Sequence, residues 1–283
     1  MEKLLKEIIN RAKKTKKVIV FSEGDDRRIL NAVKIIEKEK IAKTIVLKNG
    51  SLEERLKEGV DLLLKDKADG MITGATHSTL STLKYAFHFI GTKKDVKKSS
   101  GAFLMLKGDK AFLFADCAAI VSPTSEELAE IAKLSAETFE FLTGKKARVA
   151  MLSYSTKGSG KGESVHRVRK SVEIAKKFGI NVEGEMQADS ALIKEVCEKK
   201  YKNCKFKEAN VLVFPDLNSG NIGYKLVERL GNYKAIGPVM QGLKKPVNDL
   251  SRGCSVQDIV NLCAITVLQN QTFRKSLIKR KNF

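Results

Sequence analysis

The sequence predicts an α/β protein with mainly parallel sheets. Short apolar segments alternate with longer segments of helical periodicity along almost the whole chain, which is the pattern of parallel strands joined by helices. Hydrophobic residues make up 42% of the 283 residues, enough for a large buried core in one or two domains.

The predicted strands are short and aliphatic, and polar turns bound them. They are expected at residues 18–21, 44–47, 70–73, 102–106, 111–114, 149–152 and 211–214. Helices are expected near 26–39, 51–66, 78–90, 124–142, 163–178, 188–199 and 219–230, and a last helix begins at Val256. Because Gly108 and Asp109 separate two strands, we expect an antiparallel β-hairpin there.

Four polar segments follow predicted strands, at residues 22–26, 74–78, 153–162 and 215–221. In open α/β sheets ligands bind at this edge, and Gly-rich loops let backbone N–H groups approach phosphate oxygens. The 153–162 segment is not a Walker A loop, because Ser155 and Gly162 stand where that motif needs Gly and then Ser or Thr. No G-x-G-x-x-G follows the first strand, so ATP hydrolysis and a Rossmann dinucleotide site are disfavoured.

Charge and cysteine content narrow the class of protein further. The formal net charge is +20, but the lysines are spread along the chain and aromatic residues are few, so nucleic-acid binding is disfavoured. No apolar run reaches the ~18 residues of a membrane span, and a cytoplasmic protein is expected. The five cysteines are irregularly spaced, which supports neither a disulfide framework nor a zinc site, and no metal is expected.

A turn before the last predicted helix carries the chemistry. Ser251, Arg252 and Asp258 surround it, and a helix N-terminus with an arginine fork suits a phosphate. Asp258 lies about one turn into the helix, where it could handle a proton. However, Ser255 and Asp258 also have the spacing of a capping box, and locally that interpretation of Asp258 is at least as good. We expect Cys254 to pack as a small apolar residue rather than act as a nucleophile.

Several stretches together resemble the phosphate acetyl/butyryl transferase family. They are residues 69–82, 113–116, 149–159, 183–187, 214–225 and 241–258. The resemblance implies reversible acyl transfer between coenzyme A and inorganic phosphate, giving acetyl phosphate, with coenzyme A as a substrate and no tightly bound cofactor. It also implies two three-layer α/β/α lobes, at 1–95 plus 238–283 and at 96–237, with an active-site cleft between them, in a homodimer.

The resemblance also implies roles for individual residues. Ser251, Arg252 and Asp258 match the family's catalytic set, so Asp258 is expected to serve the chemistry even if it caps the helix. We expect substrate binding from the side chains and loops that follow the strands. These residues are Lys84, Ser155, Thr156, Lys157, Gly158, Ser159, Asn218 and Asn221.

Two departures from the family leave alternatives open. A helical stretch of about fifty residues, usual before the Asp-Gly strand, is reduced here to residues 51–67, and Lys84 stands where the family has a functional arginine. Lysine keeps the charge but loses the bidentate fork. The leading hypothesis is acetyl transfer. Butyryl or another acyl specificity is the nearest alternative, and a non-catalytic relative that binds coenzyme A or an acyl phosphate is the alternative from another class.

Overall fold

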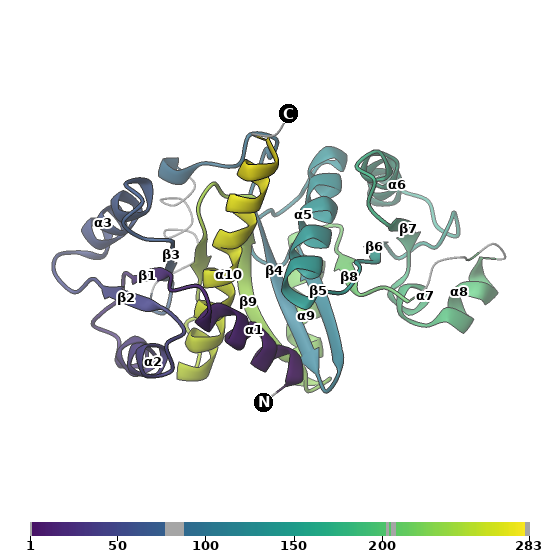
Figure 1. Cartoon of the computed structure of the whole chain (residues 1–283). Coiled ribbons are helices and arrows are strands. Elements are labelled where there is room, and N and C mark those ends of the chain that lie inside the picture. The colour runs from purple at the N-terminus through teal and green to yellow at the C-terminus, as the bar shows by residue number, and fades with distance from the viewer. Residues whose placement is uncertain (1, 77–87, 202–203, 205–207, 281–283) are drawn as a thin grey trace. The chain divides into compact units, whose positions relative to one another are not determined.

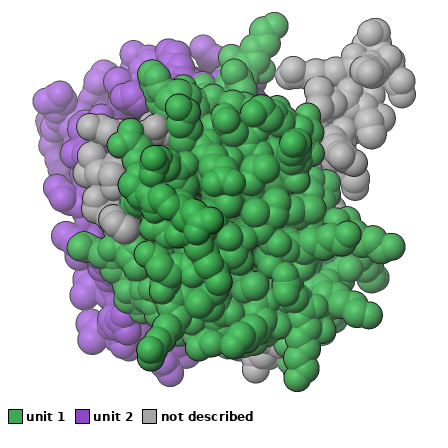
Figure 2. All heavy atoms as spheres, turned by 90° about the vertical axis from the view of Figure 1, so that its left-hand side faces the viewer, with its two compact units in different colours: residues 1–95, 236–283 green, residues 96–235 purple. Residues whose placement is uncertain are grey.

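The computed structural model describes residues 2–76, 88–201, 204 and 208–280, with 270–280 described by their backbone alone. It divides into two compact units, one made of residues 1–95 and 236–283 and the other of 96–235 (Figure 2). Each unit has its own mainly parallel sheet and its own helices, so the predicted α/β class is confirmed (Figure 1).

Unit 1 is built on a four-stranded parallel sheet in the order β10-β3-β1-β2. Its elements in chain order are α1 (Lys3–Lys13), β1 (Val18–Phe21), α2 (Arg27–Lys38), β2 (Lys43–Val46), α3 (Leu52–Leu64), β3 (Gly70–Thr73), β10 (Val247–Asp249) and α10 (Val256–Arg280). Strand β9 (Lys234–Gln241) crosses the boundary between the two units.

Helices α3 and α10 cover opposite faces of the unit 1 sheet. A Cβ on Gly59 of α3 would lie 2.6 Å from Met71 Sδ, whereas a Cβ on Gly70 of β3 would lie 2.6 Å from the methyl group of Thr266 on α10. Residues 70 and 71 are neighbours on one strand, and neighbouring side chains of a strand point to opposite faces. The sheet is therefore the middle layer of three, and its carboxyl edge stays free to carry loops.

Unit 2 contains strands in the order β7-β6-β8-β5-β4, all parallel except for the β4–β5 hairpin. Its elements are β4 (Ser100–Lys107), β5 (Lys110–Ala115), α5 (Ser125–Thr143), β6 (Val149–Leu152), α6 (Glu163–Lys176), β7 (Val182–Met186), α7 (Ala188–Leu192), α8 (Lys194–Lys200), β8 (Val211–Val213) and α9 (Leu217–Arg229). The predicted hairpin is present: it turns at Gly108, whose φ of +57° suits glycine, and Lys107 pairs with Lys110.

All seven predicted strands are present within one or two residues of their predicted bounds. Strands β7, β9 and β10 were not predicted, because β7 contains two glutamates, β9 contains Gly237 and Pro238, and β10 is only three residues long. The helix predicted at 188–199 is two helices, since Ile193 adopts an extended conformation between them. Helix α1 was not predicted either, and the helix predicted at 78–90 lies mostly outside the described residues.

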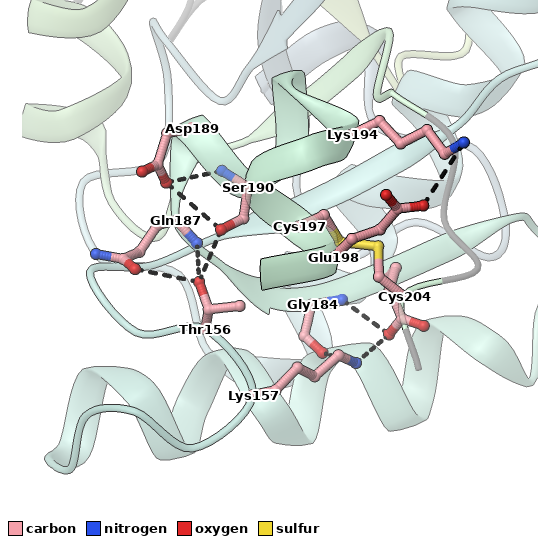
Figure 3. The surroundings of a disulfide bond; sticks show 11 residues. Thr156, Lys157, Gly184, Gln187, Asp189, Ser190, Lys194, Cys197, Glu198 and Cys204 are labelled. Atoms are coloured by element: carbon pink, nitrogen blue, oxygen red, sulfur yellow. Dashed lines mark hydrogen bonds and ion pairs between the residues drawn. A yellow bond between two sulfur atoms is a disulfide. The ribbon is translucent and has the colours of Figure 1, made fainter. Parts of the chain in front are cut away.

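The spacing of the cysteines did not indicate a disulfide, but the structure contains one. Cys197 of α8 is bonded to Cys204, which follows that helix in the chain (Figure 3). Their separation of seven residues matches no common cysteine motif, and only the turn after α8 brings the two Cα atoms within 6.0 Å. The other three cysteines, Cys117, Cys254 and Cys263, are free and buried.

Candidate active site

In unit 1 the loops that follow β1 and β3 are tied together at the carboxyl edge of the sheet. The buried carboxylate of Glu23 accepts hydrogen bonds from the backbone N–H groups of Ala75 (2.7 Å) and Thr76 (2.9 Å), and from the Thr76 hydroxyl (2.6 Å). Gly74, with φ of +90°, passes so close to β10 that a Cβ there would lie 2.0 Å from Asp249 Oδ1. These contacts place the end of β10, where the candidate turn begins, beside both loops.

Arg28, in the first turn of α2, joins these loops to the candidate turn. Its guanidinium donates to the carbonyl oxygens of Ala75 (2.7 Å), Arg252 (2.7 Å) and Cys254 (3.1 Å). Asp26 holds it in place through a 2.7 Å contact, which lowers the pKa of Asp26 below its usual value and raises that of Arg28. Because Arg28 binds the backbone of residue 252, it orients the turn without using the Arg252 side chain.

The side chains of Ser251 and Arg252 point to solvent from this turn. Both residues are exposed, and within the described part of the chain the Arg252 guanidinium makes no hydrogen bond or ion pair. The Ser251 hydroxyl oxygen accepts a hydrogen bond from the N–H of Gly253 at 3.3 Å, which leaves its own proton available to donate. The turn therefore presents one unused guanidinium and one available hydroxyl.

Asp258 forms the capping box that its spacing allows. Its Oδ2 accepts from the Ser255 N–H (3.0 Å) and hydroxyl (2.7 Å), and its own N–H donates to Ser255 Oγ (3.2 Å). Among the described residues no hydrogen bond reaches its second carboxylate oxygen, Oδ1. The cap therefore occupies one carboxylate oxygen, and the geometry is compatible with both interpretations left open by the sequence.

Cys254 lies next to Arg252 but is buried. Burial raises the pKa of its thiol to about 11, so the thiolate that a nucleophile requires is scarce near neutral pH. Its packing agrees with the expectation of a small apolar residue.

In unit 2 the loop after β5 is organised by Asp116. Its buried carboxylate accepts four backbone N–H groups, those of Gly101, Ala118, Ala119 and Ile120, at 2.6–3.1 Å. Helix α9 begins against this loop, where a Cβ on Gly220 would lie 2.1 Å from the Asp116 carbonyl oxygen. This contact sets the position of the α9 N-terminus, which carries Asn218 and Asn221.

In the loop after β6, every backbone N–H group from residue 155 to 160 donates a hydrogen bond to another atom of the chain. Ser153 and Ser159 hydroxyls accept from Ser155 and Thr156. The N–H groups of Lys157 and Gly158 donate to Glu185, at its carbonyl oxygen and its Oε1. Those of Ser159 and Gly160 donate to the Thr156 carbonyl oxygen and to Ser155 Oγ. Each of these N–H groups is already paired with an atom of the chain, and the substrate binding predicted for residues 155–159 stays a prediction.

Glu185 of β7 is the centre of this loop. Its buried carboxylate accepts from the Ser155 hydroxyl (2.9 Å), the Gly158 N–H (2.8 Å) and two nitrogens of Arg169 (3.0 Å each). Burial raises the pKa of Glu185, but these hydrogen bonds together outweigh burial and leave the pKa below its usual value. The loop is consequently held by one ionised carboxylate.

The other predicted substrate-binding residues differ in how far they are available. The Lys157 ammonium donates to Gly184 O (2.8 Å) and contacts Glu183, and the Asn221 amide donates to Cys117 O (3.0 Å). Asn218 is exposed, with no hydrogen bond of its side chain in the described part of the chain. Lys84 lies outside the described residues, so its predicted role stays a prediction.

Sequence reasoning did not single out Arg28, Glu185 or Arg169. Glu185 falls within the family-like stretch 183–187, which was the only signal for it. Arg28 and Arg169 are ordinary helical arginines by pattern, and only their contacts with distant residues reveal what they do.

The described residues include neither a metal-binding cluster nor a membrane-spanning helix. No group of three or more His, Cys, Asp and Glu side chains is arranged to hold a metal ion. No described helix is long and apolar enough to cross a membrane.

Comparison with known proteins identifies the family. The model of the family described as "Phosphate acetyl/butaryl transferase" matches residues 3–62 and 49–267. The chain belongs to this family. A phosphate acetyltransferase of Thermoanaerobacterium thermosaccharolyticum is 40% identical over 95% of this chain and 99% of that protein.

Two further relatives support the assignment. A phosphate acetyltransferase of Bacillus subtilis is 49% identical over 214 residues, which are 75% of this chain and 66% of the relative. The crystal structure of a phosphotransacetylase from Streptococcus pyogenes superposes with a TM-score of 0.87 at 36% identity, covering 94% of this chain and 99% of the other.

Proposed function

We propose that the protein is a phosphate acetyltransferase, which reversibly transfers an acetyl group between coenzyme A and inorganic phosphate. The observation that carries the proposal is the turn of unit 1 in a member of this family. It brings Ser251, Arg252 and Asp258 into one short segment, and no described residue pairs with the Arg252 guanidinium. Relatives at 40–49% identity bear the same activity in their names. Coenzyme A is a substrate in this proposal, and no tightly bound cofactor takes part.

The thiol of coenzyme A would attack the carbonyl carbon of acetyl phosphate. The thiol proton passes to Asp258 through the oxygen that does not cap the helix, a C–S bond forms, and the C–O bond to phosphate breaks with its electron pair leaving on phosphate. The exposed Arg252 guanidinium holds the phosphate and offsets its charge. The Ser251 hydroxyl donates to the carbonyl oxygen as that oxygen becomes negative, an interaction typically worth about 3 kcal/mol.

The turn is suited to these roles because it is already oriented. Arg28 holds the carbonyl groups of residues 252 and 254 through bonds that do not involve the proposed catalytic side chains. A group that is oriented before the substrate arrives loses less free energy when the reaction begins. Among the proposed substrate-binding residues that the structure describes, Asn218 has an exposed side chain that makes no hydrogen bond to another described residue.

Thioester formation from acetyl phosphate and coenzyme A tests the proposal, with Arg252→Ala beside the wild type. We expect turnover by the wild type and a loss of about 10²–10³-fold in kcat for the variant, since the lost donor acts on transition-state charge. Arg229→Ala is the matched control, because Arg229 is also exposed, at 81%, but lies on α9. Folded wild-type protein without turnover would contradict the proposal, and faster turnover of butyryl phosphate would overturn the acetyl preference.

We also propose a homodimer that forms through α9. Ile222, Leu226 and Leu230 recur at every fourth residue and are 57%, 51% and 83% exposed, so they make one apolar stripe along the helix. The occupant we propose is a second copy of the same stripe, because a two-fold contact brings identical surfaces together and an apolar contact can offset repulsion between two chains of charge +20.

Light scattering coupled to size exclusion tests the dimer. The wild type should run at twice the chain mass, and Leu226→Asp should run as a monomer with unchanged circular dichroism. Leu64→Asp is the control, because Leu64 is 50% exposed but lies on α3. A wild-type monomer, or a dimer that survives Leu226→Asp, would overturn this assignment. The cytoplasmic location stays a prediction.

A further inference from the structure

The disulfide between Cys197 and Cys204 closes a short segment at the end of α8. Cys197 is buried, while Cys204 is partly exposed. The chain turns back after the helix, with Tyr201 N–H donating to Cys197 O and Cys204 N–H donating to Tyr201 O. The two sulfur atoms therefore differ in access to solvent although one bond joins them.

The closed segment contacts the loop after β6 through Tyr201. The ammonium of Lys157 lies 5.4 Å from the centre of the Tyr201 ring, within the range of a cation–π interaction. Lys157 has a φ of +47°, a conformation that is uncommon for a residue other than glycine. Tyr201 contacts the Lys157 ammonium together with Glu183 and the Gly184 carbonyl oxygen.

A second route runs from Lys200 to the same loop. The Lys200 ammonium donates to Asp189 Oδ2 (2.6 Å) and to Gln187 Oε1 (2.9 Å). Gln187 in turn donates its N–H to Thr156 Oγ1 at 3.0 Å, and Figure 3 shows Thr156 directed toward Gln187 and Ser190. The segment that the disulfide closes thus contacts the loop directly at Lys157 and reaches Thr156 only through Gln187.

We propose that Cys197 and Cys204 form a reversible thiol–disulfide exchange site for low-molecular-weight thiols, and that its closed form holds the 155–160 loop in place. Cys204 is the sulfur that the small thiol attacks, because it is the more accessible of the two. In a reducing compartment a disulfide is more often redox-active than structural. The proposal goes beyond acetyl transfer, but one candidate thiol, coenzyme A, rests on that proposed function.

The exchange balances in two steps. A small thiolate attacks Cys204 Sγ, which forms a mixed disulfide and releases Cys197 as a thiolate that then takes up a proton. A second small thiolate attacks the sulfur of the first, which releases a small-molecule disulfide and the Cys204 thiolate. Two small thiols are oxidised and one protein disulfide is reduced, and the reverse sequence closes the site again.

Thiol counting tests the exchange without any need for enzymatic activity. The full chain is equilibrated in glutathione buffers of varied redox ratio, and in a parallel series with coenzyme A and its disulfide. It is then alkylated under denaturing conditions, and its mass is measured by mass spectrometry. We expect three alkylated cysteines in oxidising buffer, the five of the chain less the two in the bond, and five in reducing buffer. Five alkylated cysteines at every ratio would overturn the proposal. The series that switches at the lower thiol concentration identifies the better co-reactant.

Two single variants locate the attacked sulfur. Cys197→Ser should collect a mixed disulfide on Cys204, whereas Cys204→Ser should collect none, because Cys197 is buried. An adduct on Cys197 and not on Cys204 would overturn the assignment of the attacked atom. Cys263→Ala is the control, because Cys263 is buried and takes no part in the disulfide. This variant should switch at the same redox ratio as the wild type, with one alkylated cysteine fewer in each form.

Amide hydrogen exchange tests the effect on the loop. In the reduced form, and in Cys197→Ser/Cys204→Ser under any buffer, the amides of residues 155–160 should exchange several-fold faster than in the oxidised wild type. Equal exchange in the two forms would overturn the link between the disulfide and the loop. Because neither readout is enzymatic, failure here is separate from failure of the proposed acetyl transfer, which the thioester assay measures.

Discussion

The turn at residues 251–258 in unit 1 and the loop at 155–160 in unit 2 both follow parallel strands, but they use their polar groups differently. The turn leaves the Arg252 guanidinium unpartnered among the described residues and one oxygen of Asp258 without a hydrogen bond. In the loop, every backbone N–H from residue 155 to 160 is hydrogen-bonded within the chain, and Ser155 and Thr156 are buried. Polar groups that are still available can act on a substrate, whereas groups that are already paired stiffen their own loop. We therefore expect the chemistry at the turn and a supporting role for the loop.

The largest effect on activity should come from replacing Asp258. A second variant separates its proposed role in proton transfer from its role in capping the helix. Asp258→Asn keeps an acceptor for the Ser255 cap but removes the proton acceptor, so kcat should fall by about 10²–10⁴-fold with little change in stability. Ser255→Ala removes the cap, costs about 1 kcal/mol of stability and leaves most of the activity. Thioester kinetics and urea unfolding of both variants measure the difference. Equal activity losses in the two would mean that Asp258 serves only the helix.

A middle-sized effect should come from Glu185 and tests whether the loop is a support. Glu185→Ala leaves the buried Ser155 hydroxyl and the Gly158 N–H without their acceptor, which should lower the free energy of unfolding by about 1–3 kcal/mol. Urea unfolding measures it, beside Glu173→Ala, an exposed glutamate on α6. An unchanged midpoint would show that the loop does not depend on this carboxylate.

The smallest effect should come from Asp26, whose ion pair with Arg28 steadies the turn. The pKa of Asp26 is lowered chiefly by the hydrogen bond from Arg28, so the folded carboxyl ionises below the ~3.9 of an unfolded aspartate. A lowered folded-state pKa contributes stability that is fully present above the unfolded pKa and is lost as pH falls through the folded one.

Asp26→Asn should therefore be less stable than the wild type by about 1 kcal/mol at neutral pH, and this difference should shrink as pH falls below about 4. Urea unfolding of both proteins from pH 3 to 7 measures it. A difference that grows on acidification would contradict the direction of the pKa shift.

The fold class and most of the strands were accessible from the sequence because their signals are local. A strand such as Val149–Leu152 is apolar throughout and bounded by polar turns, so its burial in a parallel sheet is readable from composition. The Ser251, Arg252 and Asp258 set was also readable, because a turn, a guanidinium and a helix start stand within eight residues. Strand β9 was not, since its Gly237 and Pro238 argue against a strand until neighbouring strands provide its pairing.

What the sequence by itself determined is the alternation of strands and helices, the polar loops after the strands and the short constellation at residues 251–258. Only the tertiary structure decided that Arg28 binds the backbone of residues 252 and 254, more than 220 positions away, and that Glu185 occupies the donors of the 155–160 loop. It also decided the Cys197–Cys204 bond. The physical reason is that periodicity and propensity act over one or two turns of chain, whereas the pairing of a buried donor depends on which distant acceptor packing brings within hydrogen-bond distance.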